Sequence, residues 1–581
     1  LYTQEAVDCV LQDNLHGLEI DPRCVELAAF ALGFAAWRYP GAGGYRTLPE
    51  MNLACSGLAI AAKKEEWLKL AGEDSNLQIV LDDLYDQFEK APILGSLINP
   101  KTGLSRGNLL GLKWKDVAPL LVKAVSRGDL DDEKMEMGVV ARGLSKAAAL
   151  MARQYQLVIT NVPYLARGRQ NDFLKKFGQE HYPDSRRDLA TIFLDRCFIY
   201  CADCGSVSLV LPQNWLFLTS YKNFRERLLK HNDWQMIARL GAQAFETPMW
   251  DFNVQLFLIK KNITHSKVLE FPPTPENCHM IVVVDVSDLP DANEKAAILH
   301  TIELNQVGQV QQLKNPDARV IFKSGISGEY LSKYAYSSHG LTTGDTPRMK
   351  MAFWEIVKTN NIWIPFQGTV EKSCMFGGNE NLLRWHNGHG PIDEIIGARK
   401  FATEAWGKKG VLVSQMHELH VTLYRTFGFD NNTAVIVPLN PDYLPPIWCF
   451  CSSPEYNKSV RCIDQKLSVT SATLAKVPFD FEYWQKVAAE RYPEGLPKPY
   501  SDDPTQWIFH GHPAQSDAPL QVAVARLLGY RWPAELDPEM ELSDEARAWV
   551  KRCDELLRYA DDDGIVCIPP VRGESAAADD L

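Results

Sequence analysis

Residues 157–164 read Leu-Val-Ile-Thr-Asn-Val-Pro-Tyr, an apolar run that passes directly into a polar tetrapeptide. The run is typical of an apolar strand, and Pro163 restricts the residue before it to an extended backbone. In an open α/β sheet, ligands bind at the carboxyl ends of the strands, and this tetrapeptide is expected to lie at that end of a central strand. The stretch therefore predicts a strand of an α/β sheet that ends in a ligand-binding loop.

The segments on both sides of this stretch alternate between strand and helix patterns. Strand patterns occur at residues 16–20, 51–60, 156–160, 207–211, 235–239 and 253–260, and helix patterns at 4–14, 23–37, 187–202 and 221–230. This alternation predicts a parallel α/β sheet with a Rossmann-like winding. Residues 63–150 are mainly helical in pattern, and we expect them to form a helical insertion.

The composition excludes several classes of protein. The chain has 581 residues with 46% hydrophobic and 23% charged side chains, which is typical of a globular protein of several domains. No apolar stretch approaches the ~18 residues of a membrane span, and no signal peptide is visible. The 13 cysteines are odd in number and irregularly spaced. They favour reduced thiols in the cytoplasm over a secreted disulfide framework.

The negative net charge of -12 is concentrated at one end of the chain. Residues 481–581 carry 20 Asp and Glu against 10 Lys and Arg, whereas residues 331–480 carry 13 against 15. Because the local field steers binding more than the total charge does, a phosphate-bearing partner is compatible with this sequence.

The tetrapeptide has the groups that an exocyclic amine on a planar base needs. Such an amine is a poor nucleophile, because its lone pair is delocalised into the ring. The amide oxygen of Asn161 and the carbonyl of Val162 can accept its two N–H groups, while Pro163 fixes that carbonyl. Tyr164 offers a flat face on which a base stacks for about 1–3 kcal/mol. The alternative is an ordinary strand end followed by a proline turn.

A second candidate element lies earlier in the chain, at residues 17–22, which read Gly-Leu-Glu-Ile-Asp-Pro. Glu19 ends the predicted strand and can accept hydrogen bonds from both ribose hydroxyls of a nucleotide-like cofactor, while Ile20 can pack on its adenine ring. Asp21 and Pro22 predict the start of the next helix as its cap and first-turn residue. The alternative is an ordinary acidic strand end before a helix.

Together and in this order, these two elements resemble the adenine-specific (N6) DNA methyltransferases. The signature of that family is Asn-Pro-Pro-Tyr or a close variant, and here Val162 replaces the first proline. Residues 211–216, 239–246, 340–345 and 405–407 extend the resemblance. It is closest to large phage-defence methylases of the BREX and DISARM type and to restriction-modification enzymes.

The resemblance implies a fold, a reaction and partners. The fold is an α/β, Rossmann-like class I methyltransferase sheet with a helical insertion, followed by a mixed α/β target-recognition domain and a helical C-terminal tail. The reaction is site-specific methyl transfer from S-adenosyl-L-methionine to N6 of an adenine flipped out of double-stranded DNA. Other subunits of a defence system are further expected partners, and a membrane is not.

We accordingly expect six regions. They are the first part of the methyltransferase domain (1–62), the helical insertion (63–150), the catalytic part (151–264), a linker or small β region (265–335), the target-recognition domain (336–481) and an acidic helical C-terminal region (482–581).

The resemblance also implies two further cofactor features. The family's glycine-containing loop belongs upstream of Glu19, and the chain begins too late to contain it, so we expect an N-terminally truncated chain. An acidic or amide residue usually follows the second strand near the adenine amine of the cofactor. The segment here is residues 52–57, in which Ser56 is the candidate.

A basic run follows the tetrapeptide and is the candidate for DNA contact. Such a run beside the pocket can neutralise phosphates while one base is flipped out. The alternative is a solvated helix face. The residues are Arg167, Arg169, Lys175, Lys176, Arg186 and Arg187.

No metal site is expected. Cys201 and Cys204 form a lone Cys-x-x-Cys pair without a second pair at zinc spacing.

Two other functions stay open. The first alternative is a DNA-binding subunit of a defence complex with impaired catalysis. The second is a methyltransferase that acts on RNA or on protein amides.

Overall fold

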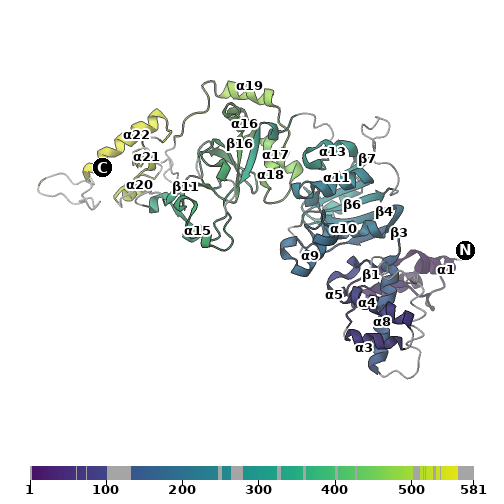
Figure 1. Cartoon of the computed structure of the whole chain (residues 1–581). Helices are drawn as coiled ribbons and strands as arrows, with labels where there is room; N and C mark the ends of the chain where they lie inside the picture. Colours follow the sequence, from purple (N-terminus) through teal and green to yellow (C-terminus); the bar gives the residue numbers. More distant parts are fainter. Residues whose placement is uncertain are drawn as a thin grey trace. The chain divides into compact units, whose positions relative to one another are not determined.

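The computed structural model divides the chain into two compact units, Leu1–Leu216 with Ser220–Phe322 (unit 1) and Phe217–Thr219 with Lys323–Leu581 (unit 2) (Figure 1). The residues that it describes are 3–60, 62–72, 75–100, 132–246, 252–262, 279–322, 329–356, 362–399, 403–425, 428–500, 511–514, 516, 518–527, 531–536, 538, 540–559 and 573. Each unit is described by itself below.

Unit 1 begins with a helix–strand–helix–strand segment. After α1 (Thr3–Cys9) and a π-helix (Val10–Asn14) come β1 (His16–Glu19), α2 (Pro22–Arg38) and β2 (Asn52–Cys55). The strands β1 and β2 pair in parallel as a two-stranded sheet. The Asp21 carboxylate accepts the N–H of Arg23, and Pro22 lies in the first turn of α2. The predicted start of this helix is confirmed.

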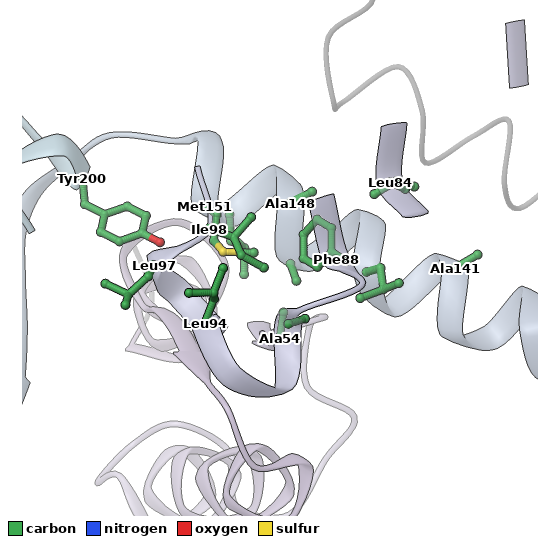
Figure 2. Close-up of a cluster of buried hydrophobic side chains, with 14 of the residues drawn as sticks. Ala54, Leu84, Phe88, Leu94, Leu97, Ile98, Ala141, Ala148, Met151 and Tyr200 are labelled. Carbon is green, nitrogen blue, oxygen red and sulfur yellow. The ribbon is translucent and has the colours of Figure 1, made fainter. Parts of the chain in front are cut away.

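The described part of residues 63–150 is helical, as expected. It contains α3 (Lys64–Leu68), α4 (Ser75–Phe88), α5 (Ala91–Leu94), a 3-10 turn (Gly95–Leu97) and α8 (Asp132–Ala152). Apolar side chains of these helices form one buried cluster, to which β2 contributes Ala54 and α10 (Leu189–Tyr200) contributes Tyr200 (Figure 2). The helical insertion thus shares its core with the elements that carry the candidate site.

A six-stranded sheet forms the centre of unit 1, in the order β3-β4-β6-β5-β7-β8. Strand β3 is parallel to β4, and β5 is parallel to β7, but β6 is antiparallel to both of its neighbours. The prediction of a parallel sheet was therefore wrong for β6, because an apolar run has the same pattern in either strand direction. The strands are β3 (Tyr155–Asn161), β4 (Cys201–Pro212), β5 (Asn232–Gly241), β6 (Val254–Lys261), β7 (Met280–Asp285) and β8 (Asn305–Gly308).

Helices cover this sheet and extend it past the expected boundary. Helix α10 packs against β3 and β4, and α11 (Lys222–His231) packs against β5. Beyond β6, the sheet continues through β7, α12 (Ala292–Leu299), β8 and α13 (Gln309–Lys314). We expected a linker or small β region over residues 265–335, but the apolar run of β7 pairs with β5 and is largely buried.

Unit 2 contains two four-stranded sheets, in the orders β14-β13-β16-β9 and β10-β12-β11-β15. All their pairs are antiparallel except β11 with β15. Their strands are β9 (Ala335–His339), β10 (Lys350–Ala352), β11 (Trp363–Gln367), β12 (Asn381–Arg384), β13 (Gly410–Ser414), β14 (Val421–Tyr424), β15 (Gly428–Phe429) and β16 (Thr433–Pro438). Its helices are α14 (Thr346–Met349), α15 (Pro391–Glu394), α16 (Leu444–Cys451), α17 (Pro454–Ile463), α18 (Ser471–Leu474), α19 (Phe481–Arg491), α20 (Pro519–Leu527), α21 (Pro533–Leu536) and α22 (Asp544–Asp554).

The last helices of unit 2 share a core with its second sheet. Trp532 and Trp549 belong to one buried cluster with Phe353 and with Leu382 of β12. At the surface, the carboxylate of Glu541 pairs with Lys409 and Arg425 at 3.0 and 2.5 Å. The apolar cluster thus attaches the described C-terminal helices to the second sheet, and the ion pairs attach the segment before α22 to the ends of β13 and β14 in the first.

In the part of the chain that the structure describes, no helix combines the length and the apolar character that crossing a membrane requires.

Candidate active site

The predicted tetrapeptide begins at the last residue of β3. Asn161 is exposed there, whereas the side chain of Val162 is buried at 4% exposure. The hydroxyl of Tyr164 donates to Oδ1 of Asn161 at 3.3 Å. The turn at Pro163 thus brings the two polar side chains of the tetrapeptide together at an exposed strand end.

Tyr164 lies between the apolar core of the sheet and a second aromatic ring. One side packs against a cluster that includes Leu240 and Val254, and the ring of Phe252 lies 5.6 Å away at 44°. Burial, and then the charge of Asp188, raise the pKa of Tyr164 to about 12, so its hydroxyl keeps its proton at neutral pH. Phe252 was not among the residues predicted from the sequence, and its place just before the strand pattern at 253–260 was the available signal.

The segment after Tyr164 is attached to the start of α10. Oδ1 of Asp188 accepts the N–H of Leu165 at 3.3 Å, and the Leu165 carbonyl accepts the N–H of Leu189 at 3.0 Å. Burial raises the pKa of Asp188, while its hydrogen bonds to backbone N–H groups oppose that shift. Asp188 was likewise not among the residues predicted from the sequence. Its place as a cap before an apolar helix was its only local signal.

The second candidate element lies at the end of β1. Oε1 of Glu19 accepts the backbone N–H groups of Ile20 and Asp21 at 2.7 and 3.4 Å, whereas Oε2 has no hydrogen-bond partner among the described residues. The side chain of Ile20 is 44% exposed. An accessible carboxylate oxygen thus lies beside an exposed apolar side chain, which suits a ribose and the ring attached to it.

Ser56 has a different environment from the one that a cofactor contact requires. It is 1% exposed, and both its N–H and its hydroxyl donate to the carbonyl of Glu19, at 2.7 and 3.1 Å. Next to it, a Cβ on Gly57 would lie 2.3 Å from the carbonyl oxygen of Ile20, so glycine permits this close approach. Ser56 therefore holds the ends of β1 and β2 together and reaches a ligand only through Glu19.

The two candidate elements belong to different sheets whose strands border one cavity. The cavity has a volume of about 180 Å³ and is lined by residues 16–18 of β1, by Tyr155 and residues 157–160 of β3 and by Phe193 of α10, among others. His16 joins its two walls, because its ring lies 5.1 Å from that of Tyr155 and 2.8 Å separates its Nε2 from Arg153 Nη1. The structure thus places Glu19 and Asn161 at the ends of two strands beside the same cavity.

The basic run is divided between residues with local partners and exposed ones. Arg167 donates to the carbonyl of Lys175 and to Gln179, while Lys175 pairs with Asp172 at 3.1 Å. The ion pair of Lys176 is longer, because its Nζ lies 3.9 Å from Oε1 of Glu180. Arg169, Lys176 and Arg187 are exposed, whereas Arg167, Lys175 and Arg186 are half-buried.

Comparison with known proteins identifies the first part of the chain. Residues 13–245 match the family described as Eco57I restriction-modification methylase. The chain is 27% identical over 262 residues to the adenine-specific methyltransferase BrxX of Escherichia coli O9:H4 (strain HS). This alignment covers 42% of the chain and 21% of that protein. The chain is also 27% identical over 426 residues to the adenine-specific methyltransferase PglX of Lacticaseibacillus casei (strain Zhang). This alignment covers 67% of the chain and 33% of that protein. The chain thus corresponds to a third or less of the length of these relatives.

A solved structure also resembles the chain over most of its length. It is a nuclease-deletion mutant of the Type ISP restriction-modification enzyme LlaGI in complex with a DNA substrate mimic, with a TM-score of 0.41 and 10% identity over 86% of this chain and 48% of that one. The family match covers β1 to β5 and includes both candidate elements. Residues 13–245 are therefore similar to the methylase domain of the Eco57I restriction-modification family.

Proposed function

We propose that this chain is the catalytic and recognition part of a site-specific DNA adenine-N6 methyltransferase that uses S-adenosyl-L-methionine in a restriction-modification or phage-defence system. The observation that carries the proposal is the geometry at the end of β3. There the amide of Asn161 is exposed and the ring of Tyr164 lies beside Phe252. The names of the two curated relatives, both adenine-specific methyltransferases, support it.

The end of β1 has the groups for the cofactor. Oε2 of Glu19 would accept hydrogen bonds from the ribose hydroxyls, and Ile20 would pack against the adenine ring of the cofactor. Ser56 holds the carbonyl of Glu19 and so orients this strand end. When bound, S-adenosyl-L-methionine supplies the electrophilic methyl group. The residues at this strand end therefore fit the cofactor by their chemistry and their exposure.

The tetrapeptide handles the base. The amide oxygen of Asn161 and the carbonyl of Val162 accept the two N–H groups of the adenine amine and draw its nitrogen toward tetrahedral geometry. No strongly basic side chain is needed, because these two acceptors stabilise the positive charge that develops as the nitrogen attacks. Tyr164 and Phe252 provide aromatic faces for the flipped base.

The exposed members of the basic run hold the DNA. Arg169, Lys176 and Arg187 contact phosphates on either side of the flipped base, while Arg167, Lys175 and Arg186 support the loop that presents them. Unit 2 includes the proposed target-recognition domain over residues 336–481, and any further subunits bind the complete protein.

A second candidate function is a DNA-binding subunit of a defence complex with impaired catalysis. Val162 favours it, because this residue leaves the carbonyl in place but loosens the backbone that a proline stiffens. The two candidates differ in one result, which is methyl transfer by the complete protein.

The test is long-read sequencing of DNA from cells that express the complete gene. We expect N6-methyladenine at one recurring sequence that is unmodified in cells without the gene. Unmodified DNA together with DNA binding by the purified protein would favour the impaired subunit. If the DNA is unmodified but RNA or protein amides are methylated, the substrate is RNA or a protein amide and not DNA.

Replacing Phe252 by alanine tests the aromatic pair. Because one stacked base is worth about 1–3 kcal/mol, we expect kcat/KM for DNA to fall by about tenfold, while cofactor affinity stays unchanged. Steady-state methyl transfer and calorimetric titration measure the two quantities. Tyr483→Ala, which removes a half-exposed ring of another aromatic pair in unit 2, is the control. Equal kcat/KM values for both variants would contradict the role of Phe252.

A further inference from the structure

The carboxylate of Asp188 lies buried behind the loop that follows Tyr164, and the proposed chemistry leaves it unused. The residue is 8% exposed. Its Oδ1 accepts two backbone N–H groups, from Ala190 in the first turn of α10 at 2.9 Å and from Leu165 at 3.3 Å. One oxygen atom therefore joins the start of a helix to the residue that directly follows the tetrapeptide.

Backbone hydrogen bonds reinforce this junction. The carbonyl of Leu165 accepts the N–H of Leu189 at 3.0 Å, and the N–H of Arg167 donates to the carbonyl of Arg187 at 2.9 Å. Ala166 and Asp188 form an isolated antiparallel bridge between these two bonds. The segment after the tetrapeptide is thus held along its length by residues 187–189.

The element on the other side of the junction is rigid. Eight residues of α10 are buried, and its other end contributes Tyr200 to the core of the helical insertion. The hydroxyl of Thr191 donates to the carbonyls of Ser185 and Asp188, which orders the turn that precedes the helix. A loop attached to α10 therefore takes its position from the core of the domain.

We propose that Asp188 is a positioning residue for methyl transfer, which fixes the Asn161–Tyr164 loop by holding the N–H of Leu165 on the same oxygen that caps α10. This inference rests on the proposed function of that loop. Asp188 touches neither the base nor the cofactor in this scheme. It acts through Leu165 on the placement of the Tyr164 ring and of the amide of Asn161. Displacing reacting groups by about 1 Å can cost ~100-fold in rate, so loss of this bond is felt in kcat.

Serine and asparagine at position 188 separate the two bonds of this oxygen. Serine is as good a helix cap as aspartate, but its shorter side chain caps α10 without reaching the N–H of Leu165. Asparagine keeps an oxygen in place of Oδ1, so it retains both bonds. Asp291 is the matched control, because it caps α12 through the N–H groups of Asn293 and Glu294, at 2.9 and 3.0 Å.

We expect Asp188→Ser in the complete protein to lower kcat at least about tenfold with little change in the KM for the cofactor. Asp188→Asn should restore most of kcat, and Asp291→Ser should match the unmodified protein. Hydrogen exchange supplies the second readout. The amide of Leu165 should exchange at least about tenfold faster in Asp188→Ser than in Asp188→Asn.

The two readouts distinguish failure of this inference from failure of the proposed function. If the unmodified protein transfers no methyl group but the Leu165 amide loses protection in Asp188→Ser, the proposed function fails and the attachment of the loop stands. If the protein is active and Asp188→Ser keeps its full kcat, the positioning role is overturned. Equal loss of kcat in Asp188→Ser and Asp188→Asn would also overturn it, because the carboxylate charge would then matter and the bond to Leu165 would not.

Discussion

Replacing Asn161 by alanine in the complete protein is expected to lower methyl transfer to adenine by at least about 100-fold. The amide oxygen of Asn161 is one of two acceptors for the amine of the base, and the hydroxyl of Tyr164 holds that oxygen at 3.3 Å. Without it, the amine keeps its planar geometry, and the charge that develops on nitrogen loses a partner. Transfer of a radiolabelled methyl group to DNA measures the effect.

Binding measurements separate this loss from misfolding. The Asn161→Ala variant should keep its affinity for the cofactor, because Glu19 and Ile20 lie on another sheet. Asn293→Ala, on the exposed face of α12, is the control and should retain full activity. Unchanged methylation by Asn161→Ala would refute the role of the tetrapeptide. A parallel loss of cofactor binding would show that the variant disturbs the whole domain.

Replacing Arg225 by methionine is expected to destabilise unit 1 by about 3 kcal/mol. The side chain is fully buried, and its guanidinium donates to the carbonyls of Trp215, Asp317 and Ala318 at 2.5, 2.7 and 3.3 Å. Burial, and then the charge of Arg319, lower the pKa of Arg225, but an arginine stays protonated near neutral pH. Methionine fills a similar volume and leaves three carbonyl groups without this donor.

Scanning calorimetry of the complete protein measures this effect. We expect the unfolding transition of unit 1 to move down by roughly 5 °C. The control lies on the same helix. Arg227 is 40% exposed and pairs with Asp195 at 2.7 Å, and such a surface pair is worth about 1 kcal/mol or less. Similar shifts for Arg225→Met and Arg227→Met would show that the buried guanidinium does not hold these carbonyls in place.

Local patterns in the sequence predicted the elements that carry the candidate site. The apolar run before Asn161 is β3, and the Asp21–Pro22 pair begins α2. These elements depend on neighbours within a few residues along the chain, so the sequence alone was sufficient to predict them. The roles of Asn161 and Glu19 stay predictions, which follow from the chemistry of single side chains at strand ends.

Such local patterns could not predict the contacts between segments that are distant in the sequence. The antiparallel insertion of β6 between β4 and β5 depends on pairing along whole strands, and an apolar run has the same pattern in either direction. No local pattern predicts that the hydroxyl of Ser56 donates its hydrogen bond to the carbonyl of Glu19.

The chemistry available at the end of β3 was thus determined by four consecutive residues, because it depends on their own functional groups. Which groups surround them was decided by the tertiary structure alone. Phe252 reaches Tyr164 across 88 positions of the chain, and Asp188 reaches Leu165 across 23. Such contacts form only when the sheet and α10 pack together, since burial of their apolar faces brings distant segments together.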